Sequence, residues 1–245
     1  MKIDRITVVG IPVDNVREED IKDAACYLTD DKTALRQIVF LSLWDLMRAR
    51  RDKEYRSCVE QALVIPVSKG ILKGAKFQKK KVPARHMPFD FMIQFFSALE
   101  AQGYSLYLLG CRPAELRNIE HNLKQTFPDL KIVGRYTGYY QKSKDDDIST
   151  AIKKASPHCV LIGSGIRGKE KWISRHRNIF SSGVFIYSPL VMDIISGKRT
   201  AVSRETFSRG LEFVPDLIRH PFRILRCIVY MYYTFLLLIY RLRNK

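Results

Sequence analysis

Two short apolar runs, each ended by a glycine and separated by one amphipathic stretch, constrain the fold of this chain most. They cover residues 104–110 and 129–134. Both are short and bounded by turns, which is typical of strands buried on both faces. Between them, apolar residues recur at helical spacing over 114–127, which predicts a helix with one face packed on a sheet. The sequence therefore predicts a βαβ unit, whose ligands bind at the carboxyl ends of its strands.

The turn after the first run offers two interpretations. It reads Gly110-Cys111-Arg112-Pro113. Free amides at the start of the helix, together with Arg112, would suit a phosphate or diphosphate. Alternatively, Gly110 and Pro113 only turn the chain and start the helix. The residues alone leave both interpretations open.

The rest of the chain alternates strands and helices in the same manner. Strands are predicted at 5–10, 37–42, 62–68, 104–110, 129–134, 159–162 and 183–187, with residues 11–14 turning out of the first. Helices are predicted at 16–28, 44–51, 91–102, 114–127, 148–155 and around 172–176. This alternation predicts an α/β fold of Rossmann-like type, with a mostly parallel sheet covered by helices on both faces. We expect residues 1–205 to form this domain and residues 206–245 a C-terminal helical appendage.

The charge balance predicts an anionic partner. Forty-two Lys and Arg residues against 25 Asp and Glu give a net charge of +17. Nucleic acid, a sugar nucleotide and an acidic lipid are the candidates. The basic residues do not follow one regular stripe, and the sequence has no aromatic platform or zinc-binding pattern of the kind that reads nucleic acid. We therefore predict no nucleic-acid partner; strongly salt-dependent binding of DNA or RNA would contradict this.

Cysteine usage and the N-terminus suggest a compartment. The five cysteines are odd in number and widely spaced, with no CxxC pair or ligand spacing. This favours a reduced, cytoplasmic setting and predicts no metal cluster. The chain starts directly with a predicted strand and has no apolar signal region, so we expect that it is not exported.

The segment 222–245 differs from the rest of the chain. Its uninterrupted apolar run, 227–240, has 14 residues and is shorter than the roughly 20 that span a bilayer as a helix. The run is rich in tyrosine and is bracketed by arginines, which is typical of a segment seated in the headgroup region of an anionic membrane. A core helix or an oligomer contact is the alternative, and a homo-oligomer stays open.

With these segments in order, the chain resembles the WecG/TagA/CpsF glycosyltransferases from about residue 6 to residue 226. The residues that carry the resemblance are 107–110 with Pro113, 128–134 through 138–140, 163–165 with 170–173, and 210–213 followed by 221–226. The resemblance implies a Rossmann-like transferase that takes N-acetylmannosamine or a similar sugar from a UDP donor. The acceptor would be a polyprenyl-diphosphate-linked sugar, and the enzyme would be cytoplasmic and peripheral on the inner face of the cell membrane. The resemblance implies no metal and no cofactor.

The candidate catalytic residues come from a place where this chain departs from the family. The family has an aspartate after its third strand, proposed as the base, whereas the turn 66–70 here has no carboxylate. Ser68 and Lys69 stand near that position, and a serine hydroxyl is not a base near neutral pH. Arg85 matches a family arginine and would grip the donor diphosphate, or it is an ordinary surface arginine. Asp90 matches a family aspartate and would act as base, or it caps the helix that starts at Phe91.

The resemblance also gives candidate binding residues, which lie at the glycine turns and just after them. They are Gly110, Arg112, Pro113, Gly134, Gly138, Tyr139, Gly163, Gly165 and Glu170. Arg112 and its neighbours would shape the nucleotide turn, and Tyr139 would line the nucleoside side. Glu170 would bond a sugar or ribose hydroxyl, or would only favour the start of its helix. Because the family aspartate is missing, a binding protein that keeps the pocket without the chemistry is the second hypothesis.

Overall fold

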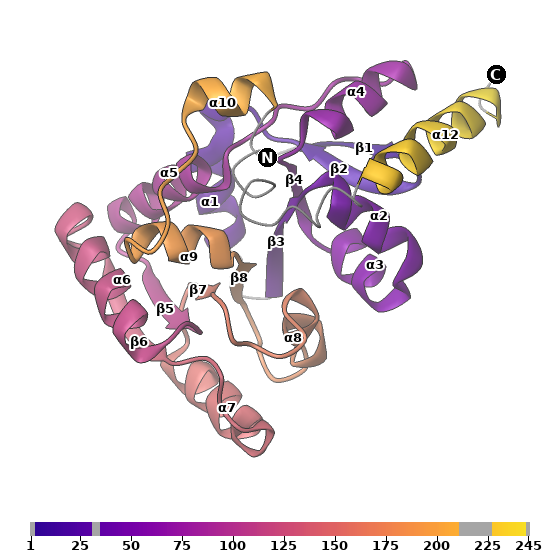
Figure 1. The fold of residues 1–245 in the computed structure, drawn as a ribbon. Coiled ribbons are helices and arrows are strands. Elements are labelled where there is room, and N and C mark those ends of the chain that lie inside the picture. The colour runs from indigo at the N-terminus through magenta and orange to yellow at the C-terminus, as the bar shows by residue number, and fades with distance from the viewer. Residues whose placement is uncertain (1–2, 31–34, 211–226, 244–245) are drawn as a thin grey trace.

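A six-stranded, all-parallel sheet forms the centre of the molecule. The computed structural model describes residues 3–30, 35–210 and 227–243 (Figure 1). The strands are β3 (Leu35–Leu41), β4 (Leu63–Pro66), β5 (Ser105–Leu109), β6 (Lys131–Tyr136), β7 (Cys159–Ile162) and β8 (Gly183–Tyr187). Their order across the sheet is β4-β3-β8-β7-β5-β6. The predicted α/β fold with a parallel sheet is confirmed.

Helices cover both faces of this sheet (Figure 1). One layer consists of α1 (Ile21–Asp30), α5 (Pro88–Ala101), α6 (Pro113–Thr126) and α9 (Pro189–Ile195). The other consists of α2 (Leu43–Arg51), α3 (Lys53–Glu60), α7 (Asp145–Ala155) and α8 (Glu170–Arg175). Successive side chains of a strand point to opposite faces, so Leu106 and Leu108 of β5 join the first layer while Tyr107 and Leu109 join the second. Two single-turn helices, η1 (Glu18–Asp20) and η2 (Lys142–Lys144), precede α1 and α7.

The central and edge strands of the sheet differ in burial. β5 and β7 are buried along their whole length, as predicted for strands covered on both faces. The same prediction is wrong for β6, where Val133 and Tyr136 are exposed. β6 pairs with one strand only, β5, and forms an edge of the sheet. Charged residues such as Lys131 are typical of such an edge because they discourage pairing with another chain.

The first residues form a small sheet of their own. β1 (Asp4–Val8) and β2 (Ile11–Asn15) pair antiparallel across a turn at 9–10. The prediction that residues 11–14 turn away was therefore wrong, because apolar Ile11 and Val13 are buried and bring the chain back along β1. Asp14 is buried as well. Its carboxylate accepts a hydrogen bond from Val64 N at 2.7 Å and pairs with Arg5, which fixes the hairpin to β4.

At several places along the carboxyl edge of the sheet, the connections of adjacent strands leave to opposite faces, and one of these places lies between β5 and β7. β5 continues into α6 on one face, whereas its neighbour β7 continues into α8 on the other face. Adjacent parallel strands whose connections leave to opposite faces form a topological switch point, where α/β proteins bind their ligands. The turns after β5 and β7 therefore lie at one such switch point.

Three further helices lie near the end of the sheet that β4 forms. They are α4 (Lys69–Phe77), α10 (Arg204–Arg209) and α12 (Cys227–Arg243). Tyr233, Leu236 and Leu237 of α12 share a hydrophobic cluster with the hairpin, α2 and α4. None of the described helices is both long and apolar enough to cross a membrane. The predicted motif residues 211–213 and 221–226 lie outside the described part of the chain.

Candidate active site at the carboxyl edge of the sheet

The turns that follow β5, β6 and β7 are bound to one another through their main chains. Cys111 N donates to Ser164 O at 2.7 Å, which joins the turn after β5 to the turn after β7. Gly138 N donates to Cys111 O at 2.8 Å, and Tyr139 N donates to Gly165 O at 2.9 Å. These bonds tie the turn after β6 to both of the others. The predicted glycines at 110, 138, 163 and 165 therefore come together in one place.

The close approach of these turns explains why they need glycine. A Cβ at position 138 would lie 2.4 Å from Ser164 O, a backbone atom that cannot rotate away. At position 163 it would lie 2.5 Å from the sulfur of Met192. Gly110 has a φ of +113°, a backbone angle that residues with a side chain rarely adopt. A Cβ at this position would lie 2.9 Å from Gly163 N. The absence of side chains lets the three turns pack directly against one another.

Arg112 and Tyr139 lie in the turns after β5 and β6, respectively. Tyr139 is 62% exposed, and the Arg112 guanidinium lies 5.9 Å from the centre of its ring. Pro113 is the first residue of α6, as its fixed φ favours. The predicted free amides are fewer than expected, since Arg112 N donates to the carboxylate of Glu115 at 3.0 Å. This hydrogen bond lowers the pKa of Glu115, and Lys198 Nζ at 3.0 Å lowers it further.

Gly134 does not belong to this group of turns. It lies within β6, where a Cβ would meet the ring of Tyr107 at 2.4 Å. The missing side chain makes room for Tyr107, which is almost fully buried beside it. This contact gives Gly134 a packing role that the sequence motif did not reveal.

Three of the four predicted catalytic side chains contact α10. Asp90 accepts a hydrogen bond and ion pair from Arg204 Nε at 3.1 Å. The Arg85 guanidinium lies 3.7 Å from the ring centre of Phe207 and donates to the carbonyl oxygen of the same residue. Lys69 Nζ donates to Ser208 O at 3.2 Å, near the last carbonyls of α10, where a cation is favoured. The structure thus gathers Lys69, Arg85 and Asp90 around one short helix.

Neither Ser68 nor Asp90 caps the helix in which or before which it lies. Ser68 precedes α4 but makes no capping hydrogen bond; its Oγ accepts from Leu43 N at 3.1 Å and ties β4 to the start of α2. Asp90 lies in the first turn of α5, whose N-cap is Met87, with no side-chain cap. The alternative in which Asp90 caps this helix is therefore wrong. Its carboxylate is held by Arg204 instead.

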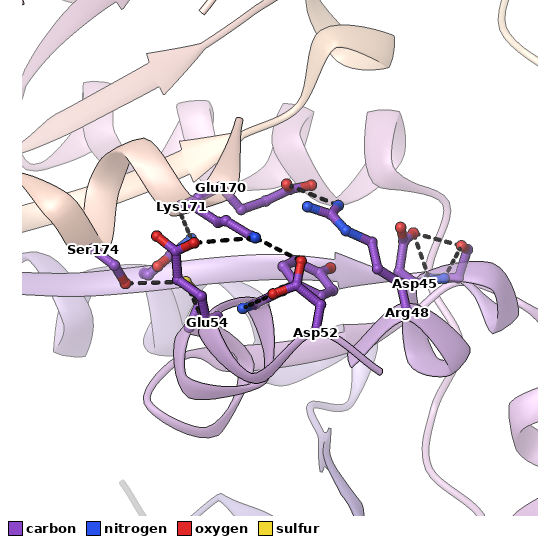
Figure 2. Close-up of polar contacts among 11 residues, drawn as sticks. Asp45, Arg48, Asp52, Glu54, Glu170, Lys171 and Ser174 are labelled. Atoms are coloured by element: carbon purple, nitrogen blue, oxygen red, sulfur yellow. Dashed lines mark hydrogen bonds and ion pairs between the residues drawn. The ribbon is translucent and has the colours of Figure 1, made fainter. Parts of the chain in front are cut away.

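Glu170 is placed between helices (Figure 2). Its side chain is only 14% exposed and pairs with Arg48 of α2 at 3.4 Å. Burial raises the pKa of Glu170, and Arg48 opposes this by favouring the charged form. Arg48 also lies 4.0 Å from the ring centre of Tyr55. The structure thus shows Glu170 in an interhelical ion pair, and its predicted contact with a sugar or ribose hydroxyl stays a prediction.

A charge network beside Glu170 was not predicted from the sequence. Lys171 bridges Asp52 at 2.6 Å and Glu54 at 3.1 Å, joining α8 to α3 (Figure 2). The bond from Lys171 lowers the pKa of Asp52. No local signal could have revealed these pairs, because their members are more than 100 residues apart. Among the described residues, no group of three or more His, Cys, Asp or Glu side chains could hold a metal ion.

Comparison with known proteins gives two matches. The profile of the "Glycosyl transferase WecG/TagA/CpsF family" matches residues 6–245. The N-acetylglucosaminyldiphosphoundecaprenol N-acetyl-beta-D-mannosaminyltransferase of Bacillus subtilis (strain 168) is 21% identical over 176 residues. That alignment covers 71% of this chain and 68% of the Bacillus protein. The profile match includes every glycine turn described above and extends over most of the chain.

Proposed function

The chain belongs to the WecG/TagA/CpsF family of glycosyl transferases, and from this premise we propose its reaction. The chain transfers an N-acetylhexosamine similar to N-acetylmannosamine from a UDP-sugar to a polyprenyl-diphosphate-linked acceptor, in the synthesis of a cell-envelope polysaccharide. The name of the Bacillus subtilis relative supports both the sugar and the class of acceptor. The UDP donor is supported by the site geometry alone.

The observation that carries the proposal is the group of glycine turns at the switch point. Their main chains approach within hydrogen-bond distance, so a ligand there meets backbone rather than side chains. A nucleoside diphosphate fits such a place, because Arg112 supplies a positive charge and the exposed ring of Tyr139 a surface on which a base can stack. In this proposal the diphosphate lies over 110–113 and 163–165, and the nucleoside lies toward Gly138 and Tyr139.

The reaction needs a proton acceptor and stabilisation of the leaving group. The acceptor hydroxyl forms a bond to the anomeric carbon, the bond from that carbon to the diphosphate breaks, and UDP leaves with the electron pair. Arg85 and Lys69 stabilise the charge that develops on the diphosphate. Asp90 takes the proton from the hydroxyl, a contribution worth about 10²–10⁴ in rate. Substrates must share or displace the contacts of these side chains with α10.

The acceptor carries a polyprenyl chain, so the enzyme works where that chain is anchored. We propose that the segment 222–245 contacts an anionic membrane surface and that the protein is peripheral on the inner, cytoplasmic face. Large apolar side chains exposed along α12 support this contact, Met231 and Leu242 being more than two-thirds exposed.

A second candidate function follows from the altered catalytic turn. Residues 66–70 hold no carboxylate, and the Ser68 hydroxyl is occupied by Leu43 N. The chain would then bind the sugar nucleotide without transferring the sugar, acting as a sensor or a scaffold at the membrane. Asp90 distinguishes the two functions, because only sugar transfer requires its carboxylate to accept a proton.

Incubation with UDP-N-acetylmannosamine and a lipid-linked N-acetylglucosamine acceptor tests the proposed function. We expect release of UDP together with an acceptor that is heavier by one N-acetylhexosamine residue. Donor binding by calorimetry without any transfer would support the second function. Absence of both binding and transfer would contradict both functions.

A further inference from the structure

A polar cluster that the proposed reaction does not use lies where α2, α3 and α8 meet the end of β8. Its members are Arg48 of α2, Tyr55 of α3, Glu170 of α8 and Tyr187, the last residue of β8, and we call it the Arg48 cluster. Arg48 Nη1 lies 3.4 Å from a carboxylate oxygen of Glu170, and the two side chains point toward one another in Figure 2. The Arg48 guanidinium also lies 4.0 Å from the ring centre of Tyr55. A carboxylate and an aromatic ring therefore hold Arg48 from two sides.

Tyr187 faces the same cluster. Burial raises the pKa of its phenol, the nearby Glu170 carboxylate raises it further, and Arg48 opposes this rise. The phenol is therefore protonated at neutral pH and can donate a hydrogen bond. Since Tyr187 is partly exposed, a molecule from solution can reach it.

The Arg48 cluster has hydrogen-bonding capacity beyond its internal contacts. A guanidinium carries five N–H donors, and 3.4 Å is long for a charge-assisted bond, which usually measures about 2.7–2.9 Å. The side chains of Arg48 and Glu170 are 27% and 14% exposed. The Tyr55 hydroxyl is buried and has no hydrogen-bond partner among the described residues. Because buried polar groups are nearly always bonded, this hydroxyl is an expected contact point for a polar molecule.

The charges and a neighbouring ring indicate the chemical class of this molecule. Two carboxylates, Glu170 and Asp45, lie near Arg48, so the cluster has no net positive charge with which to hold a phosphate. A neutral molecule with several hydroxyls fits, because each hydroxyl can accept from Arg48 or Tyr187 and donate to a carboxylate. Trp44 lies one helical turn before Arg48 on the same face of α2 and is 45% exposed. Its large ring offers an apolar surface to the C–H face of a sugar.

The cluster lies between the two parts of the proposed active site. In the order β4-β3-β8-β7, strands β3 and β8 separate the turn after β7 from Lys69, Arg85 and Asp90 beside β4. The connections of β3 and β8 leave to opposite faces of the sheet, so their ends form another switch point. The three strand spacings from β7 to β4 amount to about 14 Å. A sugar bonded to a diphosphate over the turn after β7 would lie across β8 and β3 to bring its anomeric carbon toward Asp90.

We propose that Arg48 and Tyr187 bind hydroxyl groups of the donor sugar and that Trp44 packs on one face of its ring. The sequence indicated none of these three residues. They determine how tightly the sugar, as distinct from the nucleotide, is bound. This inference rests on the proposed UDP-sugar donor and names the side chains that recognise its sugar.

Calorimetry on the full-length chain, with UDP and UDP-N-acetylmannosamine as the two probes, tests this assignment. Arg48→Gln should weaken binding of the sugar nucleotide about tenfold or more, because it removes a charged donor, while the affinity for UDP stays unchanged. Tyr187→Phe removes one neutral hydroxyl and should weaken binding of the sugar nucleotide about two- to tenfold. This variant keeps the ring and its packing, so it tests the assignment where Arg48→Gln does not fold. Trp44→Ala should likewise weaken binding of the sugar nucleotide and not of UDP.

A matched control separates sugar binding from the packing of the helices. Arg48→Gln leaves Glu170 buried without its partner and should lower the free energy of unfolding. Lys171→Gln also lowers it, because it removes the contacts of Lys171 with Asp52 and Glu54 in the same joint between α3 and α8 (Figure 2). In the control, the affinities for UDP and for the sugar nucleotide should both equal those of the unaltered chain.

Two results would overturn the inference. The first is an equal loss of affinity for UDP and for the sugar nucleotide in Arg48→Gln and Tyr187→Phe, which would make the cluster purely structural. The second is an affinity for the sugar nucleotide that neither variant changes. Sugar transfer by the unaltered chain would leave the proposed function intact in both cases.

The unaltered chain tests the proposed function separately. The expected variant pattern without any sugar transfer would support the sugar-binding residues and favour the second candidate function. If the unaltered chain bound neither UDP nor UDP-N-acetylmannosamine, the proposed donor and the inference that rests on it would both be contradicted.

Discussion

The two ends of the carboxyl edge of the sheet are built by different means. After β5, β6 and β7, the turns are joined main chain to main chain, with glycines at their closest approaches. Beside β4, the candidate residues Lys69, Arg85 and Asp90 are joined to α10 by side-chain contacts. In the first region, glycine allows the turns to pack in one close arrangement. The second depends on ion pairs and a ring contact that a substrate could replace.

This difference matches the division of labour in the proposed reaction. A donor that is held by backbone needs a rigid frame, which the glycine turns give. The charge that develops on the leaving diphosphate and the proton of the acceptor hydroxyl need charged side chains that can exchange partners. The predicted site residues follow the same division, since glycines were predicted at the first region while the turn 66–70 contains no carboxylate. Substitutions in each region should therefore have different consequences.

Asp90→Asn should give the largest effect. If Asp90 accepts the proton, its replacement lowers kcat by about 10²–10⁴ while donor affinity stays unchanged. Arg204→Ala is the matched control, because it removes the partner of Asp90 but leaves the carboxylate. The Asp90–Arg204 pair is largely exposed and contributes little to stability. Steady-state kinetics of both variants make the comparison, and an equal, small loss of kcat in the two would remove Asp90 from the mechanism.

Gly138→Ala should disrupt the backbone region. The new Cβ meets Ser164 O at 2.4 Å, so the turns must separate, and overpacking of this kind lowers the free energy of unfolding by about 1–3 kcal/mol. Displacing the site by about 1 Å is expected to cost on the order of 10² in transfer rate. Gly197→Ala has a left-handed φ of +79° but no neighbour within 4 Å. Denaturation and activity assays should show only a loss of about 1 kcal/mol in that control.

Tyr139→Ala tests the nucleoside end of the same region. Stacking of a base on an aromatic ring contributes about 1–3 kcal/mol, so calorimetry should show UDP binding weakened about tenfold or more. Tyr139→Phe keeps the ring and should bind UDP normally. Tyr27→Ala removes a comparably exposed tyrosine from α1 and controls for surface changes. Unchanged affinity in Tyr139→Ala would place the base elsewhere.

Glu170→Gln should give the smallest effect, visible in the pH dependence of stability. Burial raises the pKa of Glu170 above its ordinary 4.5. In the pH window between 4.5 and this raised pKa, the folded chain therefore binds more protons than the unfolded chain. Stability then falls as pH rises through this window, and the glutamine variant lacks this fall. Urea denaturation across the window should show that the free energy of unfolding of the variant rises relative to that of the unaltered chain as the pH rises. A difference in the free energy of unfolding that stays constant with pH would show that the pKa of Glu170 is not raised.

Local features of the fold were predictable from the sequence. The helix at 114–127 and the turn at Gly110 follow from apolar spacing and turn chemistry, which involve neighbours in the chain. The hairpin was missed because residues 11–14 contain a proline and look like a turn. Only the burial of Ile11 and Val13 reveals a second strand. β6 was predicted as a buried strand from its short apolar run, and its place at the edge is seen only in the order of the sheet.

The candidate site was predictable where it consists of glycines and unpredictable where it consists of pairs. Arg85 and Phe207 are 122 residues apart, and no local pattern indicates that they meet. The same holds for Arg48 and Glu170, also 122 residues apart. Gly134 matched a family motif, yet its neighbour Tyr107 explains the missing side chain by packing alone. Side-chain partners that are distant in sequence need a three-dimensional arrangement before they can be assigned.

Hydrogen–deuterium exchange with and without UDP tests the central claim most directly, that glycine turns at the switch point hold the donor diphosphate. Peptides covering 110–116 and 163–168 should exchange more slowly when UDP is bound, and uridine without phosphates should give much less protection. Peptides from β1 and β2 should not change. Protection confined to other parts of the chain, or absent at saturating UDP, would contradict the claim.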